Sequence, residues 1–174
     1  MPQDGFIGLF STPGNTDDRD EVLTQFNNTS WAKYAMIDDF NTNTHFMASG
    51  DLVIIDGQLQ LPPSYNASTG YTYTSSGLAL DGADTIAKST AIIDFERDAN
   101  CHVKFEVSYN DGSNYYTWLD TSVPTDHTGS EKTSSNFTAG DTIKSRVTIT
   151  TPASGDHKAV INFFGVLTDP DLFA

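Results

Sequence analysis

The side chains best able to do chemistry in this 174-residue chain are four histidines, one cysteine and an excess of aspartates. The histidines lie far apart, and none has a spacing typical of a metal-binding motif; they are His45, His102, His127 and His157. His157 follows Asp156 directly, but a catalytic role for this pair would need a nucleophile that the sequence does not indicate. The histidines therefore predict no metal site.

The chain also lacks the sequence signatures of common catalytic sites. It contains no nucleophile elbow, no H-E-x-x-H helix, no P-loop and no dinucleotide fingerprint. A glycan-cleaving sandwich stays open as an alternative, because two carboxylates on separate strands follow no recognisable spacing. We therefore expect a protein that is not an enzyme.

Cys101 is the only cysteine, so it cannot form a disulfide within the chain. It stands at the start of a strand pattern with the same parity as Val103, and free cysteines are commonly buried. We therefore expect a small core side chain rather than a reactive thiol.

Acidic residues outnumber basic ones by 23 to nine, which gives a net charge of −14. Nucleic acid is disfavoured as a partner, because binding a phosphate backbone needs clustered lysines and arginines. No apolar segment is long enough to insert in a membrane, and the N-terminus lacks the pattern of a secretory signal. No cofactor is expected. Three acidic clusters could bind calcium, although we expect them to be solvated acids. The clusters are Asp17, Asp18, Asp20 and Glu21; Asp38 and Asp39; and Asp81 and Asp84.

The elements that must position these groups are β-strands. In the stretch 101–119, apolar residues alternate with polar ones up to Asn110, Asp111 and Gly112, which form a turn signal before a second, aromatic strand. The stretch 51–61 predicts another hairpin around Asp56 and Gly57. Further strands are predicted at 85–96, at 142–150 and at 159–166, and the last is apolar on both faces, as expected of a central strand or one covered by an arm.

These patterns predict an all-β fold, an antiparallel β-sandwich of the jelly-roll-like kind, with no helix long enough to cross between parallel strands. Residues 1–30 differ from the remainder and predict an N-terminal arm or a short helix after Thr16. Residues 31–168 then form the sandwich, and residues 169–174 form a C-terminal tail.

Aromatic side chains could form a sugar-binding platform, and the candidates for ligand binding are Tyr71, Tyr73 and Tyr115. For Tyr115, the length of the hairpin turn decides which way the side chain points. A two-residue turn at 111–112 pairs Val107 with Tyr116 and Phe105 with Trp118, which buries Tyr116 and Trp118 and points Tyr115 outward. A four-residue loop keeps this parity, whereas a loop of three or five residues reverses it.

Residues 104–166 resemble a β-sandwich seen in tail, fibre and head-decoration proteins of tailed viruses, and also in carbohydrate-binding modules. The matching features are Ser-Tyr-Asn-Asp-Gly, a Tyr-Thr-Trp return strand, Phe-Thr-Ala-Gly-Asp before Ile-Lys-Ser-Arg-Val-Thr-Ile, and Thr-Pro before a final apolar strand.

The resemblance implies a structural protein located in the virion. Its partners would be other virion proteins, and it would form a homo-oligomer, a trimer. The segments expected to contact neighbours are the N-terminal apolar patch and the tail, with residues Phe6, Ile7, Leu9, Phe10, Leu172 and Phe173. The alternative is a carbohydrate-binding or receptor-binding module that recognises a cell-surface glycan.

Overall fold

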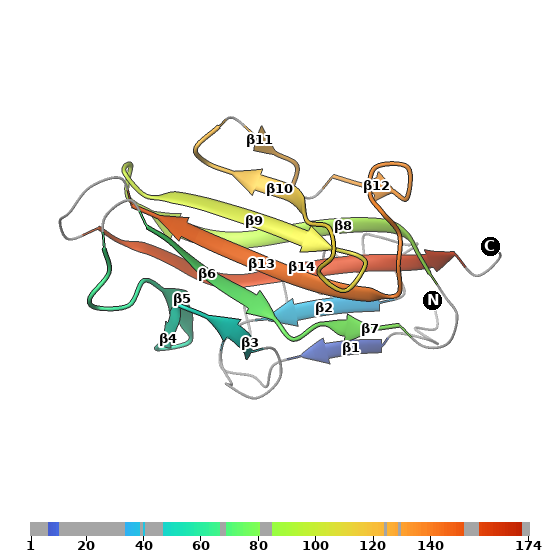
Figure 1. Ribbon diagram of the computed structural model, residues 1–174, viewed down its shortest axis with the longest axis horizontal. Helices are drawn as coiled ribbons and strands as arrows, with labels where there is room; N and C mark the ends of the chain where they lie inside the picture. Colours follow the sequence, from blue (N-terminus) through green and yellow to red (C-terminus); the bar gives the residue numbers. More distant parts are fainter. Residues whose placement is uncertain are drawn as a thin grey trace.

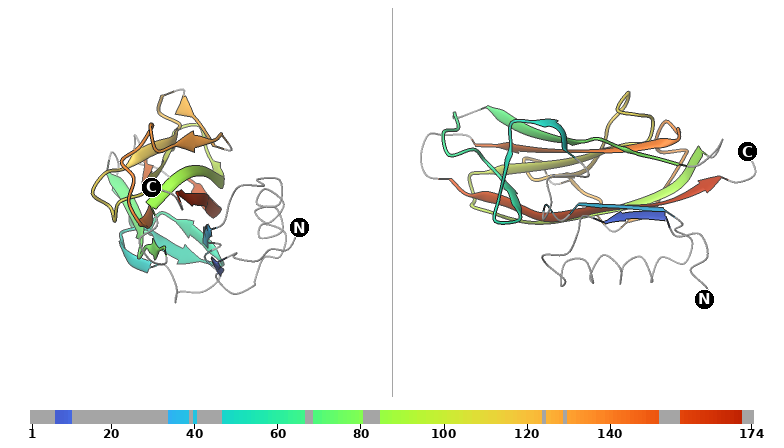
Figure 2. Two further views of the ribbon diagram at one scale, coloured as in Figure 1. Left: turned by 90° about the vertical axis from the view of Figure 1, so that its right-hand side faces the viewer. Right: turned by 90° about the horizontal axis from the view of Figure 1, so that it is seen from below.

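The computed structural model describes residues 7–10, 34–38, 40, 47–66, 69–80, 85–123, 125–128, 130–151 and 157–171. These residues form two seven-stranded sheets packed face to face, so the predicted all-β sandwich is confirmed. The right-hand view of Figure 2 shows β14, β2 and β1 in one layer and β13 in the other. The predicted short helix after Thr16 lies outside the described residues.

The first sheet, sheet A, is built around its long C-terminal strand (Figure 1). That strand, β14, pairs with β8 along one edge and with β2 and β5 along the other. The strands of sheet A are β1 (Ile7–Phe10), β2 (Tyr34–Asp38), β4 (Val53–Ile55), β5 (Gln58–Gln60), β8 (Thr85–Arg97), β12 (Lys132–Thr133) and β14 (Ala159–Asp171).

The second sheet, sheet B, has the order β11-β10-β9-β13-β6-β3, and β7 also pairs with β13. Its strands are β3 (Met47–Gly50), β6 (Gly70–Ser75), β7 (Leu78–Ala79), β9 (His102–Ser108), β10 (Tyr116–Asp120), β11 (Thr125–Asp126) and β13 (Thr142–Thr150). β1 and β2 run parallel, and every other ladder between these named strands is antiparallel.

Both predicted hairpins are confirmed by the backbone of their turns. Asp56 and Gly57 have φ angles of 53° and 73°, and Asp111 and Gly112 have 57° and 83°. Two successive residues in the left-handed region form the turn whose twist suits a two-residue hairpin, and aspartate and glycine tolerate it best. The first turn joins β4 to β5, and the second joins β9 to β10.

The apolar core between the sheets follows from strand alternation. β13 alternates strictly between buried and half-buried residues, with Ile143, Val147 and Ile149 turned inward as predicted. The largest fully buried side chains come from both sheets, from the loop after β2 and from the residue that follows β9: Trp118, Tyr73, Tyr109, Phe40, Phe105 and Phe164.

Sheet A is also apolar on the face that points away from this core. Phe163 and Leu167 of β14 join Ala35 and Ile37 of β2 in a second cluster whose members are at most 3% exposed, and Ile92 of β8 packs against them. Sheet A is therefore covered on both faces at this point. Of the two alternatives expected for the last strand, a central position or cover by an arm, the first is confirmed, since β14 lies between β8 and β2.

Candidate functional site

Three side chains able to bind a metal meet where the chain crosses from sheet A to sheet B. The crossing is the tight turn between β8 and β9, and Asp98 builds it. Oδ1 of Asp98 accepts hydrogen bonds from the backbone N–H of Asn100 (3.0 Å) and of Cys101 (3.1 Å). Asp suits this position because its short side chain can bond the backbone two residues ahead. Nη1 of Arg97 closes the turn from outside by donating to the carbonyl of Cys101 (2.8 Å).

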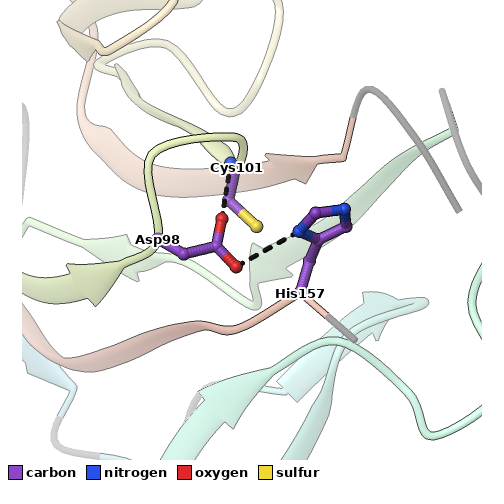
Figure 3. A group of neighbouring side chains, drawn as sticks. All are labelled: Asp98, Cys101 and His157. Atoms are coloured by element: carbon purple, nitrogen blue, oxygen red, sulfur yellow. Dashed lines mark hydrogen bonds and ion pairs between the residues drawn. The ribbon is translucent and has the colours of Figure 1, made fainter. Parts of the chain in front are cut away.

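The third side chain, His157, comes from the segment that leads into β14. Oδ2 of Asp98 accepts a hydrogen bond from the Lys158 N–H (2.9 Å) and lies 3.3 Å from Nδ1 of His157. The Asp98 N–H in turn donates to the Lys158 carbonyl (2.9 Å). Figure 3 shows the three side chains pointing toward one another, with the Asp98 carboxylate bonded to the Cys101 backbone N–H and to the His157 ring. One ligand atom each of Asp98, Cys101 and His157 all lie within 4.8 Å of one another.

The electrostatics of this group are set by burial and by backbone donors. The N–H of Lys158 is the main cause that lowers the pKa of Asp98 to about 2, so this carboxyl is ionised at neutral pH. Burial, and then the neighbouring Asp98 carboxylate, raise the pKa of Cys101 to about 11. The thiol is therefore protonated at neutral pH and fully buried, and this arrangement does not make it a nucleophile.

A cavity of about 170 Å³ adjoins the cluster through His157. Its wall includes Pro62, Tyr65 and Lys158, and the Tyr65 hydroxyl accepts a hydrogen bond from the backbone N–H of His157 (2.8 Å). The His157 side chain is 14% exposed, so solvent reaches it. The chemistry that this cluster of three side chains supports best is metal coordination.

The sequence did not indicate this cluster, although it did predict the burial of one member, Cys101. The expected burial of Cys101 is confirmed, since the residue is 0% exposed. Asp98 and Cys101 stand in a D-x-x-C spacing, but His157 lies 59 residues beyond Asp98 and only strand pairing brings it there.

Two of the tyrosines predicted to bind a ligand are core residues. Tyr73 is 2% exposed, and its hydroxyl donates to Oδ2 of Asp38 within the core. Tyr71 is 9% exposed, and its hydroxyl accepts a hydrogen bond from the Asn66 N–H. A sugar platform needs exposed ring faces, and neither of these two tyrosines offers one. Asp38, which belonged to one of the acidic clusters, is itself only 3% exposed, and its Oδ1 accepts from the Phe40 N–H (3.0 Å).

The parity argument for the β9–β10 hairpin holds at its start and fails beyond a bulge. Tyr116 pairs with Val107 as predicted, but the register shifts after Thr117, so that Phe105 faces Leu119 instead of Trp118. Trp118 is nevertheless fully buried, as expected. Tyr116 is half-buried and packs against the edge of the core.

Tyr115 belongs to a charged network on the outer face of sheet B. The Arg146 guanidinium lies 4.0 Å above the centre of the Tyr115 ring. Nε and Nη2 of Arg146 both contact Oε2 of Glu106 at 2.9 Å, and Nζ of Lys104 contacts its Oε1 at 2.8 Å. At the hairpin tip, Lys144 pairs with Asp111 (2.8 Å). We call Lys104, Glu106, Tyr115, Lys144 and Arg146 the charged face.

The residues predicted to contact partners are described only in part. Ile7, Leu9 and Phe10 lie in β1, whose backbone pairs with β2 as part of sheet A. The described part of the N-terminal apolar patch, Ile7–Phe10, is therefore a strand of sheet A. Further predicted residues lie outside the described ranges: Phe6, Leu172 and Phe173, and also His45, Asp156 and the acidic residues at 17, 18, 20, 21, 39, 81 and 84. In the described part of the chain, no helix has the length and apolar character needed to cross a bilayer.

Comparisons with known proteins add little beyond the fold. No protein-family model and no curated protein matches this sequence. Among solved structures, a chain in the structure of infectious bursal disease virus, Gt strain, is similar over 79% of this chain, with 12% identity and a TM-score of 0.36. The match spans only 32% of that viral chain. It is a weak likeness to a virus structure, too low in TM-score to carry a functional argument, and the chain is assigned to no family.

Proposed function

We propose that this protein is a non-enzymatic structural subunit of a virus particle, a capsid-decoration or tail component. It assembles with copies of itself, as a trimer, and with other virion proteins. The resemblance of residues 104–166 to sandwich domains of tailed viruses supports this role, as does the all-β fold. The observation that carries the proposal is the charged face of sheet B.

The charged face has the chemistry of a protein–protein contact. Arg146 is held between the Glu106 carboxylate and the Tyr115 ring, so its position is set before any partner arrives. A side chain that is already ordered loses less conformational entropy on binding. Arginine and tyrosine are also among the residue types that contribute most to binding at interfaces.

The charge balance of the chain suggests what this face binds. Three of the nine basic residues, Lys104, Lys144 and Arg146, gather on it, whereas the whole chain carries a net charge of −14. With their partners Glu106 and Asp111 these three cations leave one net positive charge on the strip, so the acidic surface of a second copy is attracted to it more than to the rest of the chain. Contact between two different surfaces of the same chain can close into a ring, which is how a trimer forms.

The cluster of Asp98, Cys101 and His157 is consistent with a non-enzymatic role. Its thiol is protonated and buried, and both oxygens of its carboxylate already accept backbone hydrogen bonds. The thiol is therefore not prepared for nucleophilic chemistry, and the carboxylate is not prepared to act as a general base.

Native mass spectrometry at several salt concentrations tests the assembly. We expect trimers at low salt that dissociate as salt rises, because half-exposed charges are screened. Lys104→Ala should weaken the trimer, and Lys88→Ala should not. The two lysines are matched, since their side chains are 39% and 41% exposed and each pairs with a glutamate. A monomer at every concentration, or equal effects of the two substitutions, would contradict the proposal.

A deletion of residues 1–30 is a poor test of assembly, although the sequence alone suggests it. The deletion removes β1, which pairs with β2 along four residues of sheet A. Loss of particle incorporation could then follow from a damaged sheet. The substitutions on the charged face avoid this problem because they leave the backbone ladder intact.

A second candidate function is binding of a cell-surface glycan, and Tyr115 is the residue that favours it. This tyrosine is only partly buried, and charged groups that can bond sugar hydroxyls surround it. Glycan-array binding that is lost in Tyr115→Ala and kept in Lys88→Ala would support this function. No binding to any glycan by the folded wild-type protein would count against it.

A further inference from the structure

The crossing between the two sheets carries a second feature that assembly does not use. Asp98, Cys101 and His157 supply a carboxylate oxygen, a sulfur and an imidazole nitrogen, and these three ligand atoms lie within 4.8 Å of one another. The geometry points to a binding site for one Zn²⁺ ion, held by Asp98 Oδ2, Cys101 Sγ and His157 Nδ1, with solvent as the fourth ligand. Binding releases to solvent the proton of the Cys101 thiol and any proton on Nδ1, because zinc takes a thiolate and a neutral imidazole nitrogen.

The distances suit zinc after a small adjustment of side chains. Tetrahedral zinc bonds of about 2.0–2.3 Å place the ligand atoms about 3.3–3.8 Å apart. Asp98 Oδ2 and His157 Nδ1 are already 3.3 Å apart. The sulfur completes the set from the adjacent turn and needs to approach by about 1 Å, which a side-chain rotation supplies.

The donor set selects zinc over the calcium that acidic loops would favour. Calcium takes six to eight oxygen ligands, whereas a sulfur and an imidazole nitrogen are ligands of zinc. Three protein ligands and an open fourth position form a complete site for this ion. The cavity of about 170 Å³ that His157 lines provides the entry path and the solvent ligand.

The backbone holds the ligands in place before any ion binds. Asp98 and Lys158 exchange two hydrogen bonds, which fixes the β8–β9 turn against the start of β14. Oδ1 of Asp98 orders the turn that carries Cys101, whereas Oδ2 accepts the Lys158 N–H and faces Nδ1 of His157, the side on which an ion would bind. A bound ion would therefore tie the sheet crossing to β14 without rearranging the backbone.

The nearest cation does not occupy the site. The Arg97 guanidinium bonds the backbone carbonyls of Asp98 and Cys101 instead of the Asp98 carboxylate. Substituting a ligand therefore changes zinc binding without displacing an existing ion pair with Arg97.

Calorimetry and denaturation of the full chain, freed of metal with a chelator, test the site. We expect one Zn²⁺ per chain, and an unfolding constant about 100-fold lower when free Zn²⁺ is 100 times the Kd. His157→Gln and Asp98→Asn should weaken binding roughly tenfold or more, because even partners of metal ligands have effects of this size. The matched control is His127→Gln, whose histidine is exposed and outside the cluster, and it should leave binding unchanged.

Co²⁺ reports whether the sulfur takes part. A cobalt thiolate gives a charge-transfer absorption in the near ultraviolet, which we expect for the wild-type protein and not for Cys101→Ser. Cys101 is fully buried, so Cys101→Ala serves if the serine variant fails to fold. His157→Gln remains informative in either case, since this side chain is 14% exposed. No effect of Zn²⁺ on unfolding, zinc bound without the cobalt thiolate band, or equal weakening in His127→Gln would overturn the inference.

Discussion

A chain of buried hydrogen bonds joins the two sheets, and Tyr109→Phe breaks it. Nε1 of Trp118 donates to the Tyr109 hydroxyl (3.1 Å), which donates to Oγ of Ser89 (2.8 Å), which donates to the Leu167 carbonyl (3.1 Å). Trp118 belongs to sheet B, whereas Ser89 and Leu167 belong to sheet A. All four residues are at most 1% exposed, so water cannot replace a lost partner.

The cost of Tyr109→Phe follows from the groups that it leaves without partners. Loss of the bond to Ser89 costs about 0.5–1.5 kcal/mol, and the unpaired Trp118 donor costs about 1–3 kcal/mol. We therefore expect the free energy of unfolding to fall by about 2–4 kcal/mol. This is a large share of the roughly 5–15 kcal/mol that stabilises an ordinary domain.

Urea denaturation measures this change, and Tyr116→Phe is its matched control. The Tyr116 hydroxyl also makes two hydrogen bonds, to Oγ1 and N of Thr138, but both are exposed to solvent. Water can replace them, so the control should lose less than about 1 kcal/mol. A loss below about 0.5 kcal/mol for Tyr109→Phe, or equal losses for the two variants, would refute the reasoning.

Three further predictions rest on other buried groups. Burial raises the pKa of Tyr73 and of Tyr109 well above 10, so above pH 10 both stay neutral in the folded state while they ionise in the unfolded chain. The free energy of unfolding should therefore fall as pH rises above 10, by up to about 1.4 kcal/mol per pH unit for each tyrosine. Urea denaturation at several pH values should show a shallower fall for Tyr109→Phe than for the wild-type protein. Gly140→Ala should lower the free energy of unfolding by about 1–3 kcal/mol, because a Cβ there would lie 2.5 Å from the Tyr109 carbonyl oxygen. At Gly70 the nearest atom to such a Cβ is 3.3 Å away, so Gly70→Ala should lower it less in the same assay. Glu106→Gln should lower the free energy of unfolding by about 1–3 kcal/mol, because it leaves Lys104 and Arg146 without their shared carboxylate. The decrease should be smaller at high salt, and a decrease that is independent of salt would contradict this.

The sequence alone was enough to predict the scaffold, because the signals that specify strands and hairpins are local. Alternation in 142–150 identifies the buried face of β13, and an Asp-Gly pair identifies each hairpin turn. The same local signals fail at Trp118, where a bulge shifts the pairing by one residue, and no residue type in the strand marks the bulge beforehand.

The tertiary structure decided which side chains meet and which are exposed. Tyr71 and Tyr73 lie on β6, and their burial depends on the packing of β6 against the other sheet. His157 reaches Asp98 only because β14 pairs with β8 in register, an antiparallel contact across 59 residues of chain. Local patterns therefore determined the strands, and long-range pairing determined both the core and the candidate metal site, because register depends on contacts that no short stretch of sequence contains.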